Sequence, residues 1–136
     1  IVFNHPSERA FLNQVTHPRI FQLMLERLRK FEAETRGEGI AVLDIPLLVD
    51  ANAAGMFDYV LVVDASPEAQ ERRLMEERGS TREDARARIS AQVPREERLR
   101  HADHVIPNEG SLEDLRHEVD KAWEAILDRA RKYRSR

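Results

Sequence analysis

Residues 59–68 read Tyr59-Val60-Leu61-Val62-Val63-Asp64-Ala65-Ser66-Pro67-Glu68, and this stretch decides the fold. Its first half is a continuous apolar run, which predicts a strand over 59–65 that is buried on both faces of a sheet. Its second half is typical of a helix start, with Ser66 as the N-cap and proline at the first helical position. A buried strand that passes directly into a helix indicates an α/β fold with a parallel sheet.

Two further strands are expected, one on each side of this stretch in the sequence. Residues 40–45 are largely apolar and precede Pro46, which cannot donate a hydrogen bond to a sheet. Residues 104–108 are apolar in the middle and are stopped by Pro107. Helices are predicted in the intervals. Before the strands come a short helix from Ser7 and a longer one after His17-Pro18 that ends at Gly37 and Gly39. The others are one from Ser66 to about Gly79, an arginine-rich pair from Thr81 to about Gln92 and from Pro94 to Ala102, and a last one from Ser111, with residues 129–136 as a frayed tail.

The composition fits one globular domain and excludes several classes of protein. The chain has 136 residues, of which 41% are hydrophobic and 35% charged, and it has no cysteine. The lack of cysteine excludes a disulfide scaffold, a thiolate zinc site and a cysteine nucleophile. The 22 basic and 25 acidic residues give a net charge of −3, which argues against a nucleic-acid partner. No apolar run approaches the roughly 20 residues that span a bilayer, so we expect a cytoplasmic protein without a membrane partner. The oligomeric state stays open.

The candidate functional residues follow the predicted strands. Ligands of open α/β sheets bind beyond the carboxyl ends of the strands, which directs attention to Asp44, Asp64 and Asn108. Asp44 either holds a Mg²⁺-bound water or accepts a hydroxyl proton, or else it caps nearby backbone amides. Asp64 is better explained as a cap of the helix that follows it. Asn108, with Gly110, either contacts the edge of a base or forms a plain turn.

Arginines cluster in the predicted helical pair, and two interpretations of them are open. One is a mobile hairpin that contacts phosphates, because catalysis of phosphoryl transfer is mostly positioning and charge stabilisation. The other, which suits most of these residues better, is a solvated and ion-paired surface. The cluster comprises Arg72, Arg73, Arg78, Arg82, Arg86, Arg88, Arg95, Arg98 and Arg100.

Several short runs recur in an order and spacing that match a known family over nearly the whole chain. They are His17-Pro18-Arg19-Ile20; Asp44-Ile45-Pro46-Leu47-Leu48 with Asp50; Val62 to Glu68 with Gln70 and Arg73-Leu74; Arg78; Arg88-Ile89 with Gln92; and Ala102 to Ile106 with Asn108 and Gly110. Together these runs resemble the dephospho-CoA kinases. Each run alone is weak, and their joint register makes the resemblance specific.

The resemblance implies a fold and an activity. The fold is a P-loop kinase-like parallel sheet flanked by helices, incomplete because the P-loop strand is missing, with a helical substrate-binding region at 1–39 and a lid at 78–102. The activity is ATP-dependent phosphorylation of the ribose 3′-hydroxyl of dephospho-CoA, the last step of coenzyme A synthesis. The complete enzyme would use ATP with Mg²⁺, and its partners would be the two small-molecule substrates.

The resemblance also implies roles for individual residues. Arg78 and Arg88 would contact phosphates from the lid, and Asn108 and Gly110 would lie beside the adenine of ATP. No metal ligand is assigned. The residues that would line the dephospho-CoA pocket are His17, Asp44, Pro46, Leu47, Leu48 and Asp50. The family usually has Phe-Glu where this chain has Val49-Asp50.

One departure from the family is large. The sequence holds no G-x-x-x-x-G-K-[ST] phosphate loop, and the Asp-containing segment that supplies the family's catalytic base is also absent. We therefore expect the carboxyl-terminal part of a kinase, inactive by itself, with strand edges at 40–45 and 59–65 left unpaired. Two alternatives stay open. One is a non-catalytic relative that binds CoA-like ligands or needs a partner chain to supply the loop; the other is a helical module that binds polyanions.

Overall fold

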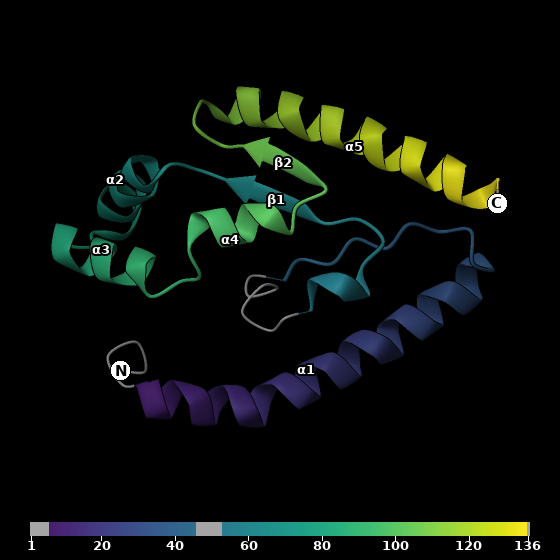
Figure 1. Cartoon of the computed structure of the whole chain (residues 1–136), viewed down its shortest axis with the longest axis horizontal. Coiled ribbons are helices and arrows are strands. Elements are labelled where there is room, and N and C mark those ends of the chain that lie inside the picture. Colours follow the sequence, from purple (N-terminus) through teal and green to yellow (C-terminus); the bar gives the residue numbers. More distant parts are fainter. Residues whose placement is uncertain (1–5, 46–52, 136) are drawn as a thin grey trace. The chain divides into compact units, whose positions relative to one another are not determined.

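The computed structural model describes residues 6–45 and 53–135. The chain divides into two compact units, Ile1–Asp44 and Ile45–Arg136, and Figure 1 shows their helices and strands. Within the described ranges, no helix combines the length and the apolar character that crossing a membrane requires.

The first unit contains one long helix, α1, which spans Pro6–Thr35. The prediction of two helices separated at His17-Pro18 is therefore wrong, because Pro18 lies inside α1. Proline removes a single backbone hydrogen bond from a helix, and the turns on both sides of Pro18 form theirs. Helix α1 ends where Arg36 and Gly37 adopt left-handed backbone angles, with φ of 54° and 77°.

The predicted strand at 40–45 does not form. These residues are irregular, and Val42 is 70% exposed rather than buried on both faces. A strand is stable only when a neighbour accepts and donates its backbone hydrogen bonds. Among the described residues, no strand pairs with 40–45, so the apolar run has no sheet to join.

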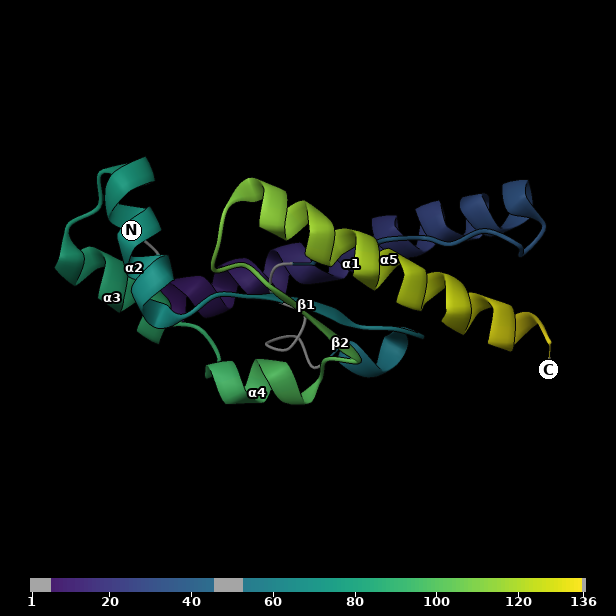
Figure 2. The ribbon, with the colours of Figure 1, turned by 90° about the horizontal axis from the view of Figure 1, so that it is seen from above.

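The second unit is built on two parallel strands, β1 (Leu61–Asp64) and β2 (His104–Pro107). Leu61 pairs with His104 and Asp64 with Pro107, which confirms the parallel α/β prediction, although β1 is shorter than the predicted 59–65. The other elements are the 3₁₀ helix η2 (Ala54–Met56), α2 (Pro67–Arg78), α3 (Arg82–Ser90), α4 (Arg95–Arg100) and α5 (Leu112–Arg134). Helices α4 and α5 lie on opposite sides of the strand pair (Figures 1 and 2).

Side-chain caps begin three of the helices, as their sequences predict. Ser66 accepts a hydrogen bond from Ala69 N at 3.2 Å at the start of α2, and Thr81 begins α3 in the same way. Ser111 and Asp114 form a reciprocal capping box on α5. Helix α3 ends at Ser90, slightly before the expected Gln92. The frayed tail predicted for 129–136 is wrong as far as Arg134, where α5 ends.

The core of the second unit is small and consists mainly of short side chains. Its buried apolar residues are Ala53, Val60, Ala69, Ala85, Ile106 and Ala122. Asp64 is the buried charged residue among those described, and it is 7% exposed. A buried charge is costly unless it is paired and hydrogen-bonded, so Asp64 requires a polar partner close by.

Candidate functional site

The carboxyl ends of β1 and β2 meet at one edge of the strand pair. Asn108, which follows β2, donates its backbone N–H to the carbonyl of Asp64 at 2.7 Å. The next residue, Glu109, accepts hydrogen bonds from the backbone N–H of Ser66 and, at 3.0 Å, from its hydroxyl. The loop after β2 is therefore tied to the start of α2, at the edge where ligands of such sheets bind.

Asp64 is paired with an arginine from a distant part of the sequence. Arg95, the first residue of α4, donates Nε to Asp64 Oδ1 at 2.9 Å and to Oδ2 at 3.0 Å, and its terminal nitrogen reaches Oδ2 at 2.5 Å. The expectation that Asp64 caps α2 is wrong, because Ser66 is that cap. The hydrogen bond and charge of Asp64 raise the pKa of Arg95, so this guanidinium remains charged.

The loop that joins β2 to α5 is fixed at its other end by the capping box. Asp114 accepts hydrogen bonds from the backbone N–H of Ser111 at 2.8 Å and from its hydroxyl at 2.7 Å. These two bonds lower the pKa of Asp114. A side chain at Gly110 would lie 2.5 Å from the Asp114 carboxylate, so only glycine fits there without displacing the cap.

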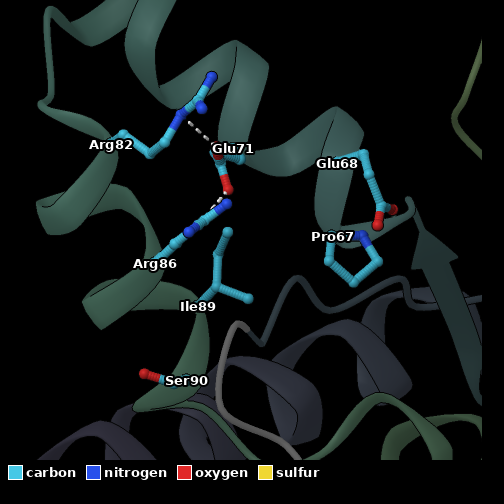
Figure 3. Close-up of a pocket in the computed structure, with 7 residues that line it drawn as sticks. All are labelled: Pro67, Glu68, Glu71, Arg82, Arg86, Ile89 and Ser90. Atoms are coloured by element: carbon cyan, nitrogen blue, oxygen red, sulfur yellow. Dashed lines mark hydrogen bonds and ion pairs between the residues drawn. The ribbon is translucent and has the colours of Figure 1, made fainter.

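Helices α2 and α3 form a hairpin held by one carboxylate. Glu71 of α2 accepts Arg82 Nε at 2.9 Å and Arg86 Nε at 2.8 Å, and both arginines come from α3. Figure 3 shows the two guanidinium groups reaching across to Glu71. The hollow between the helices is lined by Pro67, Glu68, Glu71, Arg82, Arg86, Ile89 and Ser90.

The arginines of this region divide into two groups. Four of the nine arginines of the cluster, Arg82, Arg86, Arg95 and Arg100, are in ion pairs with described residues, as the surface interpretation expects of them. Arg78, the last residue of α2, is exposed and forms no ion pair with any described residue. Arg88 lies exposed in the last turn of α3. Arg78 thus shares with Arg72 and Arg73 the lack of an ion pair to any described residue, and it is the one of the three that ends α2.

The candidate site residues are distributed over both units. Asn108 and Gly110 lie in the loop at the strand edge, and Arg78 lies on the hairpin, all in the second unit. His17, half-buried in α1, and Asp44, exposed within the irregular segment 40–45, belong to the first unit. Pro46, Leu47, Leu48 and Asp50 lie outside the described residues.

Two residues of this edge were not identified from the sequence as members of a site. Arg95 was only one arginine of a cluster, and Glu109 was part of a turn. The pairing of Arg95 with Asp64 joins residues 31 positions apart, and no local pattern encodes it. Within 6–45 and 53–135, no three His, Asp or Glu side chains gather closely enough to hold a metal ion.

Comparisons with known proteins agree in one family. The family profile described as dephospho-CoA kinase matches residues 1–114. A dephospho-CoA kinase of Corynebacterium glutamicum is 46% identical over 128 residues, which cover 93% of this chain and 62% of the relative. One of Streptomyces avermitilis is 42% identical over 130 residues, with 96% and 62% covered.

Solved structures give the same result for the fold. A protein from Thermus thermophilus superposes with a TM-score of 0.68 at 34% identity, over 93% of this chain and 62% of that one. A dephospho-CoA kinase from Campylobacter jejuni superposes with a TM-score of 0.61 at 30% identity, over 92% and 61%. The chain thus spans about 62% of the length of the curated relatives named above.

Proposed function

This chain belongs to the dephospho-CoA kinase family, and on that premise we propose that the natural protein phosphorylates dephospho-CoA with ATP. The ribose 3′-hydroxyl oxygen forms a bond to the γ-phosphorus. The bond from that phosphorus to the β,γ-bridging oxygen breaks, ADP leaves with the electron pair, and the hydroxyl proton is released. The product is coenzyme A, in the last step of its synthesis.

The adenine end of ATP is assigned to Asn108 and Gly110. The observation that supports the proposal most directly is the loop at the carboxyl edge, where Asn108 is bonded to Asp64 and Glu109 to Ser66. An asparagine amide both donates and accepts, as the edge of a base requires. The loop is held at both ends, so its groups are positioned before the ligand arrives.

The phosphates of ATP are assigned to the hairpin, with residues 78–102 acting as the lid. Arg78 and Arg88 contact the phosphates and stabilise the charge that develops on the transferred group. The position of Arg78 supports this role, since it ends α2 and forms no ion pair with a described residue. Arg82 and Arg86 are held by Glu71 and are less suited to the task.

The dephospho-CoA end is assigned to the first unit and the segment after it. Residues 1–39 form the substrate-binding region, with His17 and Asp44, and this assignment rests on the resemblance. Pro46, Leu47, Leu48 and Asp50 complete the pocket on the same ground. Mg²⁺ accompanies ATP and is coordinated chiefly by phosphate oxygens. We assign no metal ligand in this chain.

We expect the 136-residue chain to be inactive by itself. Its sequence contains no G-x-x-x-x-G-K-[ST] loop, whose backbone amides and lysine hold the β- and γ-phosphates in such kinases. The substrates are small anionic molecules rather than nucleic acid, and the cytoplasm is the proposed location.

The test is formation of coenzyme A from ATP and dephospho-CoA by the natural protein, followed by chromatography and by NMR of the phosphorylated position. Arg78→Ala is expected to lower kcat/KM by about a hundredfold, since arginines that stabilise a transferring phosphoryl group contribute strongly. Arg72→Ala is the matched control, because Arg72 is exposed on the same helix and also forms no ion pair with a described residue.

Two results would contradict parts of this proposal. Dephospho-CoA binding without turnover by the natural protein would favour a non-catalytic relative. ATP-dependent turnover by the isolated 136-residue chain would show that the phosphate loop is dispensable.

A further inference from the structure

The segment that contains the hairpin of α2 and α3 begins at the end of β1, and the residue that follows it, Arg95, contacts the same end of β1. Asp64 ends β1, and α2 begins two residues later at the Ser66 cap. After α3 the chain reaches Arg95, which grips Asp64 through two parallel contacts, Nε to Oδ1 at 2.9 Å and the terminal nitrogen to Oδ2 at 2.5 Å. One bidentate pair therefore closes the base of a segment of about thirty residues.

Formation of the Asp64–Arg95 pair carries a desolvation cost. The Asp64 side chain is 8% exposed, and removing a carboxylate from water is unfavourable even when it is paired. Helix α4 has no fully buried residue, although Val93 just before it and Leu99 within it are half-buried. The contact with Asp64 ties the first residue of α4 directly to the end of β1.

A second polar link lies beside the first. Glu109 accepts both hydrogen bonds that Ser66 offers, and its charge also acts on Arg95. Asp64, Ser66, Arg95 and Glu109 together form what we call the edge clamp. It joins the end of β1, both ends of the hairpin region and the loop at 108–110.

We propose that Arg95 is a positioning residue of the nucleotide site, which holds the hairpin in register with the loop at 108–110. This inference rests on the proposed function, in which Arg78 and Arg88 contact the phosphates and Asn108 contacts the base. Arg95 itself is engaged with Asp64 and acts through the hairpin. Loss of Arg95 leaves the loop at 108–110 in place but detaches the start of α4 from Asp64. Arg78 and Arg88 are then no longer held in a fixed position relative to that loop.

The role predicts an effect on ATP that does not extend to the other substrate. In the natural protein, Arg95→Gln is expected to raise the KM for ATP about tenfold, within the range of couplings between directly contacting residues. The KM for dephospho-CoA is expected to stay within about twofold, because Arg95 is not among the residues assigned to that substrate. Arg95→Lys keeps the charge but loses the second parallel contact, and an intermediate value is expected.

A matched control lies on the same short helix. Arg100 forms an exposed ion pair with Glu97 inside α4, so Arg100→Gln removes the same type of charge without touching the strand edge. We expect no change in either KM. In a double-mutant cycle, Asp64→Asn combined with Arg95→Gln should be no worse than the single Arg95→Gln variant.

Equal KM values for ATP in Arg95→Gln and Arg100→Gln would overturn the proposal, as would a parallel rise in both KM values with a fall in Tm. Should Arg95→Gln fail to fold, Arg95→Lys and Arg100→Lys form the comparison, with a rise expected only for the first. Calorimetric binding of ATP without dephospho-CoA separates the two proposals. If ATP binds and Arg95→Gln weakens it, while no coenzyme A forms, the proposed function fails and the positioning role stands.

Discussion

The hairpin offers a direct test of how much one carboxylate holds two helices together. The change is Glu71→Gln, which keeps the size of the side chain and removes the charge that Arg82 and Arg86 share. Both contacts are at nitrogen–oxygen distances below 3 Å, 2.9 Å for Arg82 and 2.8 Å for Arg86. The variant leaves two arginines facing a neutral amide, which has lost the charge and one of the two oxygens that accept from them.

The expected magnitude follows from exposure. The arginine side chains are 66% and 67% exposed, whereas Glu71 is only 18% exposed. Exposed ion pairs contribute about 0.2–1 kcal/mol each, so two pairs on a half-buried carboxylate should contribute about 1–2 kcal/mol. That free energy corresponds to an increase of about 5- to 30-fold in the opening of α3.

Hydrogen–deuterium exchange of the α3 amides in the natural protein measures this opening locally. The control is Glu76→Gln, an exposed glutamate of α2 without an ion pair to a described residue, for which no change is expected. The difference should shrink in about 1 M salt, where the screening length falls to about 3 Å. Indistinguishable exchange rates of the α3 amides in the two variants at low salt would refute the reasoning, because Glu71 would then not stabilise the contact between α2 and α3.

Four further predictions concern the turns and caps of the second unit. Ser111→Ala should lower the free energy of unfolding by about 1 kcal/mol through loss of the α5 cap, measured by urea unfolding. Because the pKa of Asp114 is lowered, its carboxylate stabilises the fold above pH 3.8, its ordinary pKa, and this contribution is lost as pH falls through the lowered pKa. The difference in free energy of unfolding between the natural protein and Asp114→Asn should therefore vanish in acid. A difference that does not change with pH would contradict the role of Asp114 in the cap. Gly79→Ala should cost about 1 kcal/mol because its φ is 61°, whereas Gly55→Ala, outside that backbone region, should be neutral in the same unfolding assay. Gly110→Ala should abolish the pH-dependent contribution of Asp114, because the new methyl group would lie 2.5 Å from its carboxylate; an unchanged profile would show that the loop adapts.

Local chemistry accounts for the parts of the fold that the sequence predicts well. The caps at Ser66, Thr81 and Ser111 depend on residues within one turn of each helix start, so their patterns are readable without tertiary contacts. The carboxyl edge is also predictable, because two parallel strands must end on the same side. Asn108 and Asp64 therefore meet where the alternation of strands and helices places them.

Two of the features that the sequence predicts poorly, the segment 40–45 and the partner of Asp64, depend on distant parts of the chain. An apolar run such as 40–45 becomes a strand only when another strand lies beside it. Pro18 predicts a break between two helices, yet the helix-forming turns around it outweigh one lost hydrogen bond. The partner of Asp64 is one arginine among many, and only the path of the chain through the hairpin selects Arg95.

The spacing between the two parallel strands also orders the events of folding. The bonds that join Val60 to Asp103 and Ser66 to Glu109 each link residues 43 positions apart, whereas Arg86 reaches Glu71 over 15. Short loops close at a smaller entropic cost than long ones, so the hairpin forms early and brings the two strands within reach. We therefore expect strand pairing to be the late step, so that weakening the hairpin slows folding more than it accelerates unfolding.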